Sequence, residues 1–121
     1  MNPSSPVAGT TAEKSIRRYP RVLFSAPVTL RHLIGGGVRK LRGITLDVSQ
    51  GGLGALIDGD LRPGEVVDMD LRVGDTILSA VAIVRHTTNV RSGFEFLGMT
   101  PEERLRIARV ISAKPGHSAQ A

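Results

Sequence analysis

Between residues 22 and 97, apolar and polar residues alternate along most of the chain, and short turn signals interrupt the alternation. The clearest example is residues 67–73, where aliphatic or methionine residues alternate with charged ones. A period of two places successive side chains on opposite faces of a strand, one buried and one in water. Many short runs of this kind, separated by glycine and proline, predict an all-β protein.

Six strands are predicted from these runs: residues 22–33, 38–48, 53–57, 66–73, 76–86 and 93–97. Residues 35–37, all glycine, form the turn of a hairpin between the first two strands. Pro27 has no amide hydrogen, so we expect the first strand to lie at an edge or to begin its pairing after the proline. Residues 77–84 are apolar except for Ser79, and the fifth strand is expected to be buried on both faces or nearly so.

At the end of the predicted second strand, aliphatic residues alternate strictly with small or polar ones. Ile44, Leu46 and Val48 alternate with Gly43, Thr45 and Asp47. The three aliphatic residues are therefore expected on the buried face, and Asp47 on the opposite face.

One helix is predicted after the last strand. Residues 100–103, Thr-Pro-Glu-Glu, fit a capping box with Thr at the N-cap, Pro at N1 and Glu at N3. The expected apolar stripe consists of Leu105, Ala108 and either Val110 or Ile111. Three arginines, Arg104, Arg106 and Arg109, are expected to face water. Six strands and one terminal helix imply a six-stranded antiparallel β-barrel whose helix covers an opening or packs alongside.

The chain of 121 residues is long enough for one domain, which we predict at residues 15–112. Residues 1–14 and 113–121 are rich in Pro, Ser, Thr, Ala and Gly, and they are predicted to be disordered tails. No apolar run reaches the length of a signal peptide or of a membrane span, so a cytoplasmic protein without membrane insertion is expected.

Composition narrows the classes of function. The chain has no cysteine, which excludes disulfides, thiolate metal sites and a cysteine nucleophile. The three histidines, His32, His86 and His117, are far apart in sequence and match no catalytic or metal-binding spacing, so an enzyme is not expected and no cofactor is predicted. A net charge of +5 favours anionic partners.

Residues 17–21, Arg-Arg-Tyr-Pro-Arg, place three arginines at the entrance to the predicted domain. Guanidinium groups match phosphate oxygens in geometry. Pro20 disfavours a helix here, and in an extended chain Arg17 and Arg21 lie on one face roughly 13 Å apart. The segment is therefore either an anion-binding site or an ordinary basic flank of the domain.

Residues 47–52, Asp-Val-Ser-Gln-Gly-Gly, form a second unusual stretch. The Asp47 carboxylate is suited to accept hydrogen bonds from N1–H and the N2 amine of guanine, and the Ser49 hydroxyl suits a base edge or a phosphate. Gly52 permits a positive φ and the close approach of a flat base. The alternative is an ordinary Asx or Ser turn that uses glycine for its tight geometry.

Together, the Arg17-x-x-x-Arg21 and Asp47-x-Ser49-x-x-Gly52 motifs, followed by the strand-rich pattern and the helix, resemble the PilZ domain family over roughly residues 15–112. Members of that family are receptors for the bacterial second messenger cyclic di-GMP. The resemblance implies that Arg17 and Arg21 contact the phosphates and the guanine acceptor edges of the ligand. It also implies that Asp47 and Ser49 bind a guanine and that Gly52 leaves room for it.

Further residues are implicated by the same resemblance. Arg18 adds positive charge or a stacking surface, and Gly51 lies in the motif turn. Arg85 and His86, at the end of the fifth strand, lie where family members often place further ligand contacts, although a solvated strand end is the alternative. Ile16 stands where members that bind a stacked ligand dimer have arginine, which favours a monomeric ligand.

Two alternatives accompany the receptor interpretation: a ligand-free PilZ-like adaptor and a small basic nucleic-acid-binding barrel. The scattered basic residues, the few aromatic residues and the charge of Asp47 speak against nucleic acid. The predicted function is that cyclic di-GMP clamps the arginine segment and orders it, which passes the signal to an unidentified protein partner. The protein is expected to be a monomer or a weak homodimer.

Overall fold

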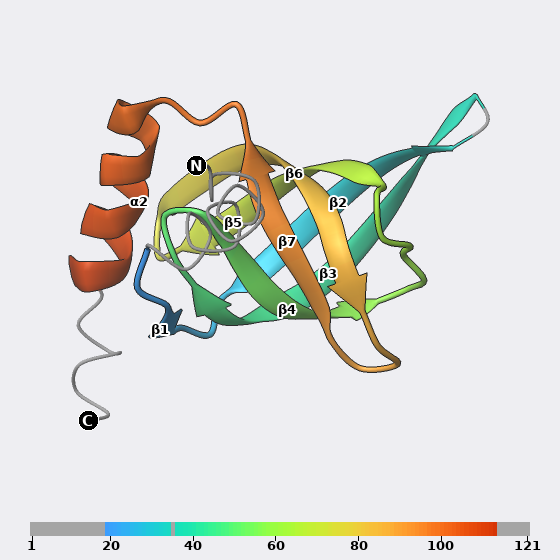
Figure 1. Ribbon diagram of the computed structural model, residues 1–121, viewed down its shortest axis with the longest axis horizontal. Helices are drawn as coiled ribbons and strands as arrows, with labels where there is room; N and C mark the ends of the chain where they lie inside the picture. Colours follow the sequence, from blue (N-terminus) through green and yellow to red (C-terminus); the bar gives the residue numbers. More distant parts are fainter. Residues whose placement is uncertain (1–18, 35, 114–121) are drawn as a thin grey trace, which may run out of the picture.

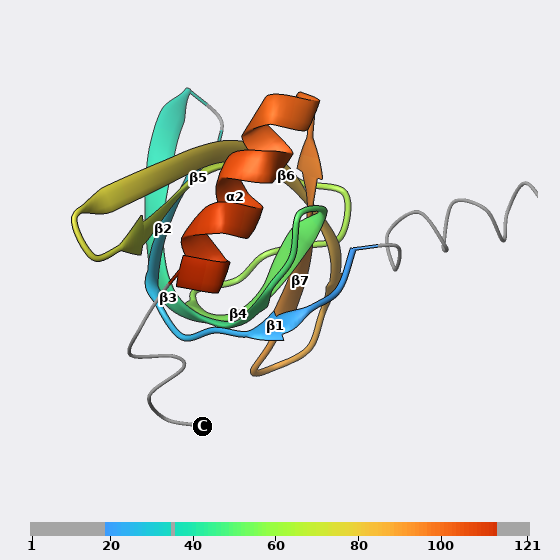
Figure 2. The same ribbon diagram turned by 90° about the vertical axis from the view of Figure 1, so that its left-hand side faces the viewer.

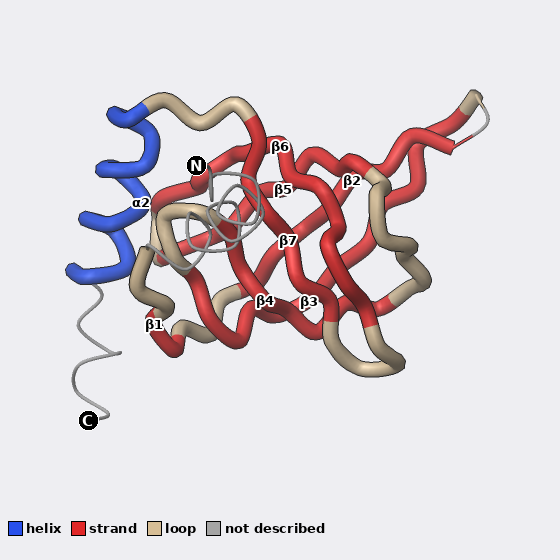
Figure 3. Tube along the Cα trace, in the orientation of Figure 1, coloured by secondary structure: helices blue, strands red, loops and turns tan. Residues whose placement is uncertain are grey.

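The computed structural model describes residues 19–34 and 36–113. Its elements are β1 (Val22–Leu23), β2 (Pro27–Ile34), β3 (Gly37–Val48), β4 (Gly52–Asp58), β5 (Val66–Val73), β6 (Thr76–Thr87), β7 (Ser92–Leu97) and α2 (Pro101–Ala113) (Figures 1 and 3). The strand order is β1-β3-β2-β5-β6-β7-β4, and β4 also pairs with β3, which closes the barrel. All strand pairs are antiparallel. The prediction of a six-stranded antiparallel barrel with one C-terminal helix is confirmed.

The core is built almost wholly from aliphatic side chains that point into the barrel. One cross-strand row illustrates it: Val48 of β3 pairs with Leu53 of β4, Leu53 with Phe94 of β7, and Phe94 with Val84 of β6. All four side chains are buried. The interior therefore needs few aromatic residues, in agreement with the composition.

The predicted first strand is in fact two strands joined by a bend at residues 24–26. β1 pairs with the end of β3 (Val22 with Val48), whereas β2 pairs with the preceding part of β3, from Pro27 with Ile44 to Ile34 with Gly37. The Thr45 hydroxyl fixes this bend, because it donates to the Phe24 carbonyl (2.5 Å) and accepts from the Ala26 amide (2.9 Å).

The prediction of which β3 side chains point into the core is wrong for the central residues of the strand. Ile44 is 51% exposed, whereas Thr45 is completely buried. A β-bulge between Thr45 and Asp47 explains the result, since the extra residue, Leu46, reverses the alternation. Val48 consequently points into the core, and Asp47 points outward as expected.

β6 is not buried on both faces. Its outward side chains Ile77 and Val81 are 49% and 41% exposed. Figure 2 shows the reason: α2 lies across the open end of the barrel and leaves the outer face of β6 uncovered. The apolar outer residues of this strand therefore face solvent.

The capping box of α2 is confirmed, and its predicted apolar stripe is confirmed at Ile111 but wrong at Leu105. The Glu103 amide donates to the Thr100 hydroxyl (3.1 Å), and the Thr100 amide donates to the Glu103 carboxylate (2.9 Å). Leu105 is 50% exposed, and the helix packs on the barrel through Ile107 and Ile111 instead. The helix rotation is set by the barrel opening, which the sequence alone does not reveal.

Arg104 also departs from the expectation that it faces water. Its guanidinium carbon lies 5.5 Å from the centre of the Tyr19 ring, a cation–π contact that links α2 to the chain just before β1. No helix in the described ranges, 19–34 and 36–113, has the length and apolar character to cross a membrane.

A polar cluster joins β2, β5 and β6 on the outer face. Arg31 Nη1 donates to Asp70 Oδ2 (3.0 Å), and the Ser79 hydroxyl donates to Asp70 Oδ1 (2.7 Å). The hydrogen bonds from Arg31 and Ser79 hold the pKa of Asp70 below its ordinary value, and the hydrogen bond to Asp70 raises the pKa of Arg31. The three strands are thus linked by side chains as well as by backbone.

We predict that Thr45→Val destabilises the protein by about 1–3 kcal/mol, because the buried Ala26 amide then loses its acceptor. Urea unfolding measures the change. Thr29→Val is the matched control, since the Thr29 hydroxyl on β2 makes no hydrogen bond in the described part of the chain, and its cost should stay within about 0.5 kcal/mol. Equal costs for the two variants would contradict the role given to Thr45.

We predict that Arg31→Ala raises the pKa of Asp70 toward its ordinary value, which carboxyl carbon NMR shifts can follow. A carboxyl with a lowered folded-state pKa stabilises the fold above its unfolded pKa of about 3.9, and this stabilisation is lost as the pH falls through the folded pKa. The variant should therefore lose less stability than the wild type in that acid range. Arg109→Ala on α2 should leave the titration of Asp70 unchanged, and an unchanged pKa in Arg31→Ala would refute the assignment.

Candidate ligand-binding site

The turn between β3 and β4 consists of residues 49–52 and is held by its own hydrogen bonds. The Ser49 amide donates to the Gly52 carbonyl (2.9 Å), and the Ser49 hydroxyl accepts from the Gly51 amide (3.1 Å) and lies 3.3 Å from the Gly52 carbonyl. The Phe96 amide of β7 donates to the Gly51 carbonyl (2.9 Å). Ser49 is buried, so its hydroxyl stabilises the turn in this structure.

Gly52 is required for a different reason from the one expected. Its φ is not positive, which corrects the sequence-based expectation. A Cβ at this position would lie 2.0 Å from the carbonyl oxygen of Phe94, on the neighbouring β7. Glycine is therefore needed here because the backbones of β4 and β7 approach so closely.

Asp47 is the centre of an ion-pair cluster on the outer face of the barrel. Its Oδ1 accepts from Arg21 Nη1 (2.6 Å) and from the Gly54 amide (3.1 Å), and its Oδ2 accepts from Arg91 Nη2 (2.8 Å). The carboxylate is largely buried, whereas both arginine side chains remain more than 40% exposed. The structure thus brings two of the predicted residues, Arg21 and Asp47, into direct contact.

Arg91 was not predicted. It ends a tight turn after β6, in which the Thr88 amide donates to the Arg91 carbonyl (2.7 Å) and the Arg91 amide donates to the Thr88 hydroxyl (3.1 Å). Arg91 and Asp47 are 44 residues apart in sequence. No local pattern connects them, because their contact depends on the pairing of β4 with both β3 and β7.

A row of four residues crosses the outer face beside this cluster, and we call it the glycine row. Asp47 of β3 pairs with Gly54 of β4, Gly54 with Gly93 of β7, and Gly93 with His86 of β6. A Cβ at Gly54 would lie 2.8 Å from Arg91 Nη2, and one at Gly93 would lie 2.3 Å from His86 Nε2. The side chains of Arg91 and His86 therefore lie in the space that the two glycines leave.

The predicted pair Arg85 and His86 sits at the other end of this row. A second bulge, between Val84 and His86, turns His86 to the outer face. Arg85 Nε donates to Glu95 Oε1 of β7 (2.6 Å), and the arginine side chain is about half exposed. His86 thus belongs to the row, and Arg85 is held beside it by an ion pair.

Two predicted residues, Arg17 and Arg18, lie outside the described residues. Within residues 19–34 and 36–113, no group of three or more His, Cys, Asp or Glu side chains is arranged to hold a metal ion. The site that the structure assembles consists of Arg21, the Asp47 carboxylate, the residue 49–52 turn and the glycine row, with Arg91 as an addition.

The closed antiparallel barrel with one C-terminal helix matches the fold of PilZ domains. The sequence model of the PilZ domain matches residues 15–113. This match spans most of the chain, and the protein belongs to the PilZ domain family. No curated protein matches the sequence at a significant level.

Solved structures share the fold. The PilZ domain of YcgR from Escherichia coli, described with c-di-GMP, is 22% identical with a TM-score of 0.69, over 86% of this chain and 95% of that one. The PilZ domain of CeSA from a cellulose-synthesizing bacterium is 20% identical with a TM-score of 0.60, over 77% and 96%. The Bacillus subtilis inhibitor of motility, MotI/DgrA, is 17% identical with a TM-score of 0.64, over 81% and 53%. At these identities the likeness establishes the fold.

We predict that Gly52→Ala destabilises the protein by about 1–3 kcal/mol, because the new methyl group meets the rigid carbonyl of Phe94. Gly54→Ala is the matched variant, two residues along the same strand. Its methyl group meets the ends of two side chains, Arg91 Nη2 (2.8 Å) and Asp47 Oδ1 (3.1 Å), which can shift more easily than a backbone carbonyl, so urea unfolding should show a smaller cost than for Gly52→Ala. Equal losses in the two variants would contradict this account of β4.

Proposed function

We propose that this protein is a receptor for cyclic di-GMP and that the ligand binds over Asp47 and the glycine row. The observation that carries the proposal is the Asp47 carboxylate, which is held at the outer surface between Arg21 and Arg91. Membership of the PilZ family supports it, as does the description of the E. coli YcgR domain with c-di-GMP. The proposed role is binding and signalling, with no catalytic step.

The chemistry of the cluster suits guanine. Guanine presents N1–H and N2–H as two neighbouring donors, and a guanidinium presents a similar pair to a carboxylate. A guanine base can therefore take the place of one arginine on Asp47. The released guanidinium is then free to bind a phosphate or the O6 and N7 acceptors of a guanine. Arg91 joins Arg21 as a proposed ligand contact.

The two glycines of the row leave room for planar side chains on the outer face, and these side chains can stack on a base. The side chains of Arg91 and His86 already lie over Gly54 and Gly93, and guanidinium and imidazole planes both stack on bases. In this proposal the Ser49 hydroxyl and Gly52 act mainly by holding the turn that positions Asp47. Arg85 supports the row through its ion pair with Glu95.

The arginine segment is proposed to be the moving part. Arg17 and Arg18 precede the described chain, and Arg21 connects them to Asp47 through its ion pair. A ligand with two phosphates would draw these cations together and fix the segment over the barrel. The ordered segment would then present a new surface to a downstream protein, in line with the sequence-based hypothesis.

Titration calorimetry of the full chain with cyclic di-GMP tests the proposal. We expect a dissociation constant of about 10 µM or tighter. Arg21→Ala and Asp47→Ala should each weaken binding at least tenfold, because each removes a charge-assisted hydrogen bond. Cyclic di-AMP should bind at least about 100-fold more weakly, since adenine lacks the N1–H and N2 donors that Asp47 accepts.

The control is Arg42→Ala, which removes an exposed arginine from the same strand as Asp47 and should leave binding unchanged. Absence of heat at millimolar cyclic di-GMP would refute the receptor function and favour an adaptor role. Equal affinity for the two dinucleotides would refute the guanine role of Asp47. Binding to duplex DNA that collapses with added salt would favour the nucleic-acid alternative.

A further inference from the structure

In the described part of the chain, one segment of β6 has a neighbouring strand on one side only. The pairing of β7 with β6 ends at Leu97 and Val81, whereas β5 pairs with β6 as far as Thr76. Within the described chain, residues 76–80 of β6 therefore have a partner strand on one side only. The remaining side of this segment faces the space between the barrel and the start of α2.

The hairpin geometry tells which backbone groups are unpaired. β5 and β6 are joined by a two-residue turn whose first residue, Gly74, has a positive φ of 61°. In such a hairpin Val73 and Thr76 exchange both backbone hydrogen bonds, and the pattern then alternates. Ile77 and Ser79 therefore direct their N–H and C=O groups away from β5, toward the open side.

This edge lacks the usual protection. Natural edge strands carry lysine, other charges, proline or a bulge, which discourage the addition of another strand. Residues 76–80 are Thr-Ile-Leu-Ser-Ala, with no charge and no proline. The bulge of β6 lies at the far end, near His86. No charge, proline or bulge within this segment therefore opposes the addition of an extended chain.

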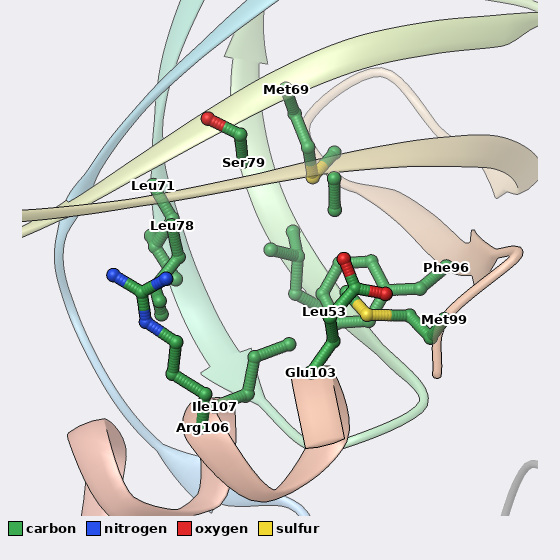
Figure 4. A pocket seen from close by; sticks show the side chains of 11 residues that line it. Leu53, Met69, Leu71, Leu78, Ser79, Phe96, Met99, Glu103, Arg106 and Ile107 are labelled. Carbon is green, nitrogen blue, oxygen red and sulfur yellow. The ribbon is translucent and has the colours of Figure 1, made fainter. Parts of the chain in front are cut away.

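An apolar pocket opens beside the edge, beneath the first turns of α2 (Figure 4). Its floor is formed by buried side chains from four strands and the helix, among them Leu53, Met69, Phe96 and Ile107. Glu103 and Arg106 of α2 lie at its polar margin. The pocket is small and partly open to solvent, and its empty space amounts to about 470 Å³ only when the adjoining solvent is included.

A second hollow continues the pocket beyond the end of β7. It is lined by Val81, Leu97 and the loop that leads into α2, and it is open to solvent, with about 570 Å³ of empty space when that solvent is included. The two hollows share Ser79 and Ala80 of the β6 edge. Together they form a groove that runs along the unpaired edge, in the position where β7 would lie if it were longer.

Acidic residues slightly outnumber basic ones around this groove, although the chain carries a net charge of +5. Arg31, which lines the groove, is neutralised by its ion pair with Asp70. Of the other charged residues, Asp68, Glu103 and Arg106 line the groove, and Asp75 and Arg72 belong to the adjoining hairpin. A segment that docks here should therefore carry positive charge.

We propose that the β6 edge binds an extended, basic segment of a partner protein as an added strand. The partner backbone would pair with Ile77 and Ser79, which supplies affinity, and side chains of one face would enter the groove, which supplies specificity. An aliphatic side chain fills the pocket beneath α2, and flanking Lys or Arg side chains meet the acidic margin. The β6 edge lies apart from Asp47, and binding of the partner segment there does not require the proposed ligand.

The test uses a fluorescent peptide that alternates Ile or Val with Lys, added to the full chain and followed by anisotropy and amide hydrogen exchange. We expect saturable binding and at least tenfold slower exchange of the Ile77 and Ser79 amides. Ile77→Pro removes one edge donor and should weaken binding at least tenfold. Ile77→Thr keeps the donor and should bind within about threefold of the wild type.

A second variant guards against misfolding of the proline variant. Ala80→Leu places a larger side chain in the groove and should also weaken peptide binding at least tenfold. If the protein binds cyclic di-GMP, the affinity of this variant for that ligand should equal that of the wild type. Unprotected Ile77 and Ser79 amides at saturating peptide would overturn the proposal. So would amide protection that rises with protein concentration without peptide, because a second copy of the chain would then occupy the edge.

Discussion

The barrel closes through β4, a seven-residue strand that must pair with β3 on one side and β7 on the other. The backbones of β3 and β7 approach the start of β4 so closely that little room is left for Cβ atoms. Two of the first three residues of β4 are accordingly glycine. Gly52 admits the carbonyl of Phe94, and Gly54 admits the ends of Arg91 and Asp47. Between them, Leu53 fills the core. Closure of the fold and formation of the site thus rest on the same short strand.

Local patterns in the sequence were sufficient for the barrel, the hairpins and the capped helix, because each follows from alternation, turn residues or a cap. They failed where distant strands decide the outcome. Thr45 looked like a surface residue but is buried, since a bulge reverses the alternation and the bend at residues 24–26 satisfies its hydroxyl. Leu105 looked buried but is exposed, since the barrel opening determines which helix face packs inward.

The candidate site was predictable as far as its motifs extend. Arg21 and Asp47, which the PilZ resemblance assigned to one ligand site, lie in direct contact, but the Ser49 hydroxyl bonds within its own turn and Gly52 does not have a positive φ. Arg91 could not be found from the sequence, because it reaches Asp47 across two strand pairings. The side chains with the longest reach, arginines, are those whose partners are least visible in a linear sequence.

The two bulges, in β3 and β6, flank the glycine row, and each directs the next residue, Asp47 or His86, to the outer surface. A bulge determines on which face of the barrel each later side chain of the strand lies. Loss of the extra residue, Leu46 or Arg85, would remove the bulge and leave every later side chain on its present face, whereas loss of another single residue within β3 or β6 would move the later side chains to the opposite face. In comparing related chains, a one-residue gap at either bulge would therefore mark a regular strand with the same outer residues, whereas a one-residue gap elsewhere in these strands would mark a barrel with a different outer surface.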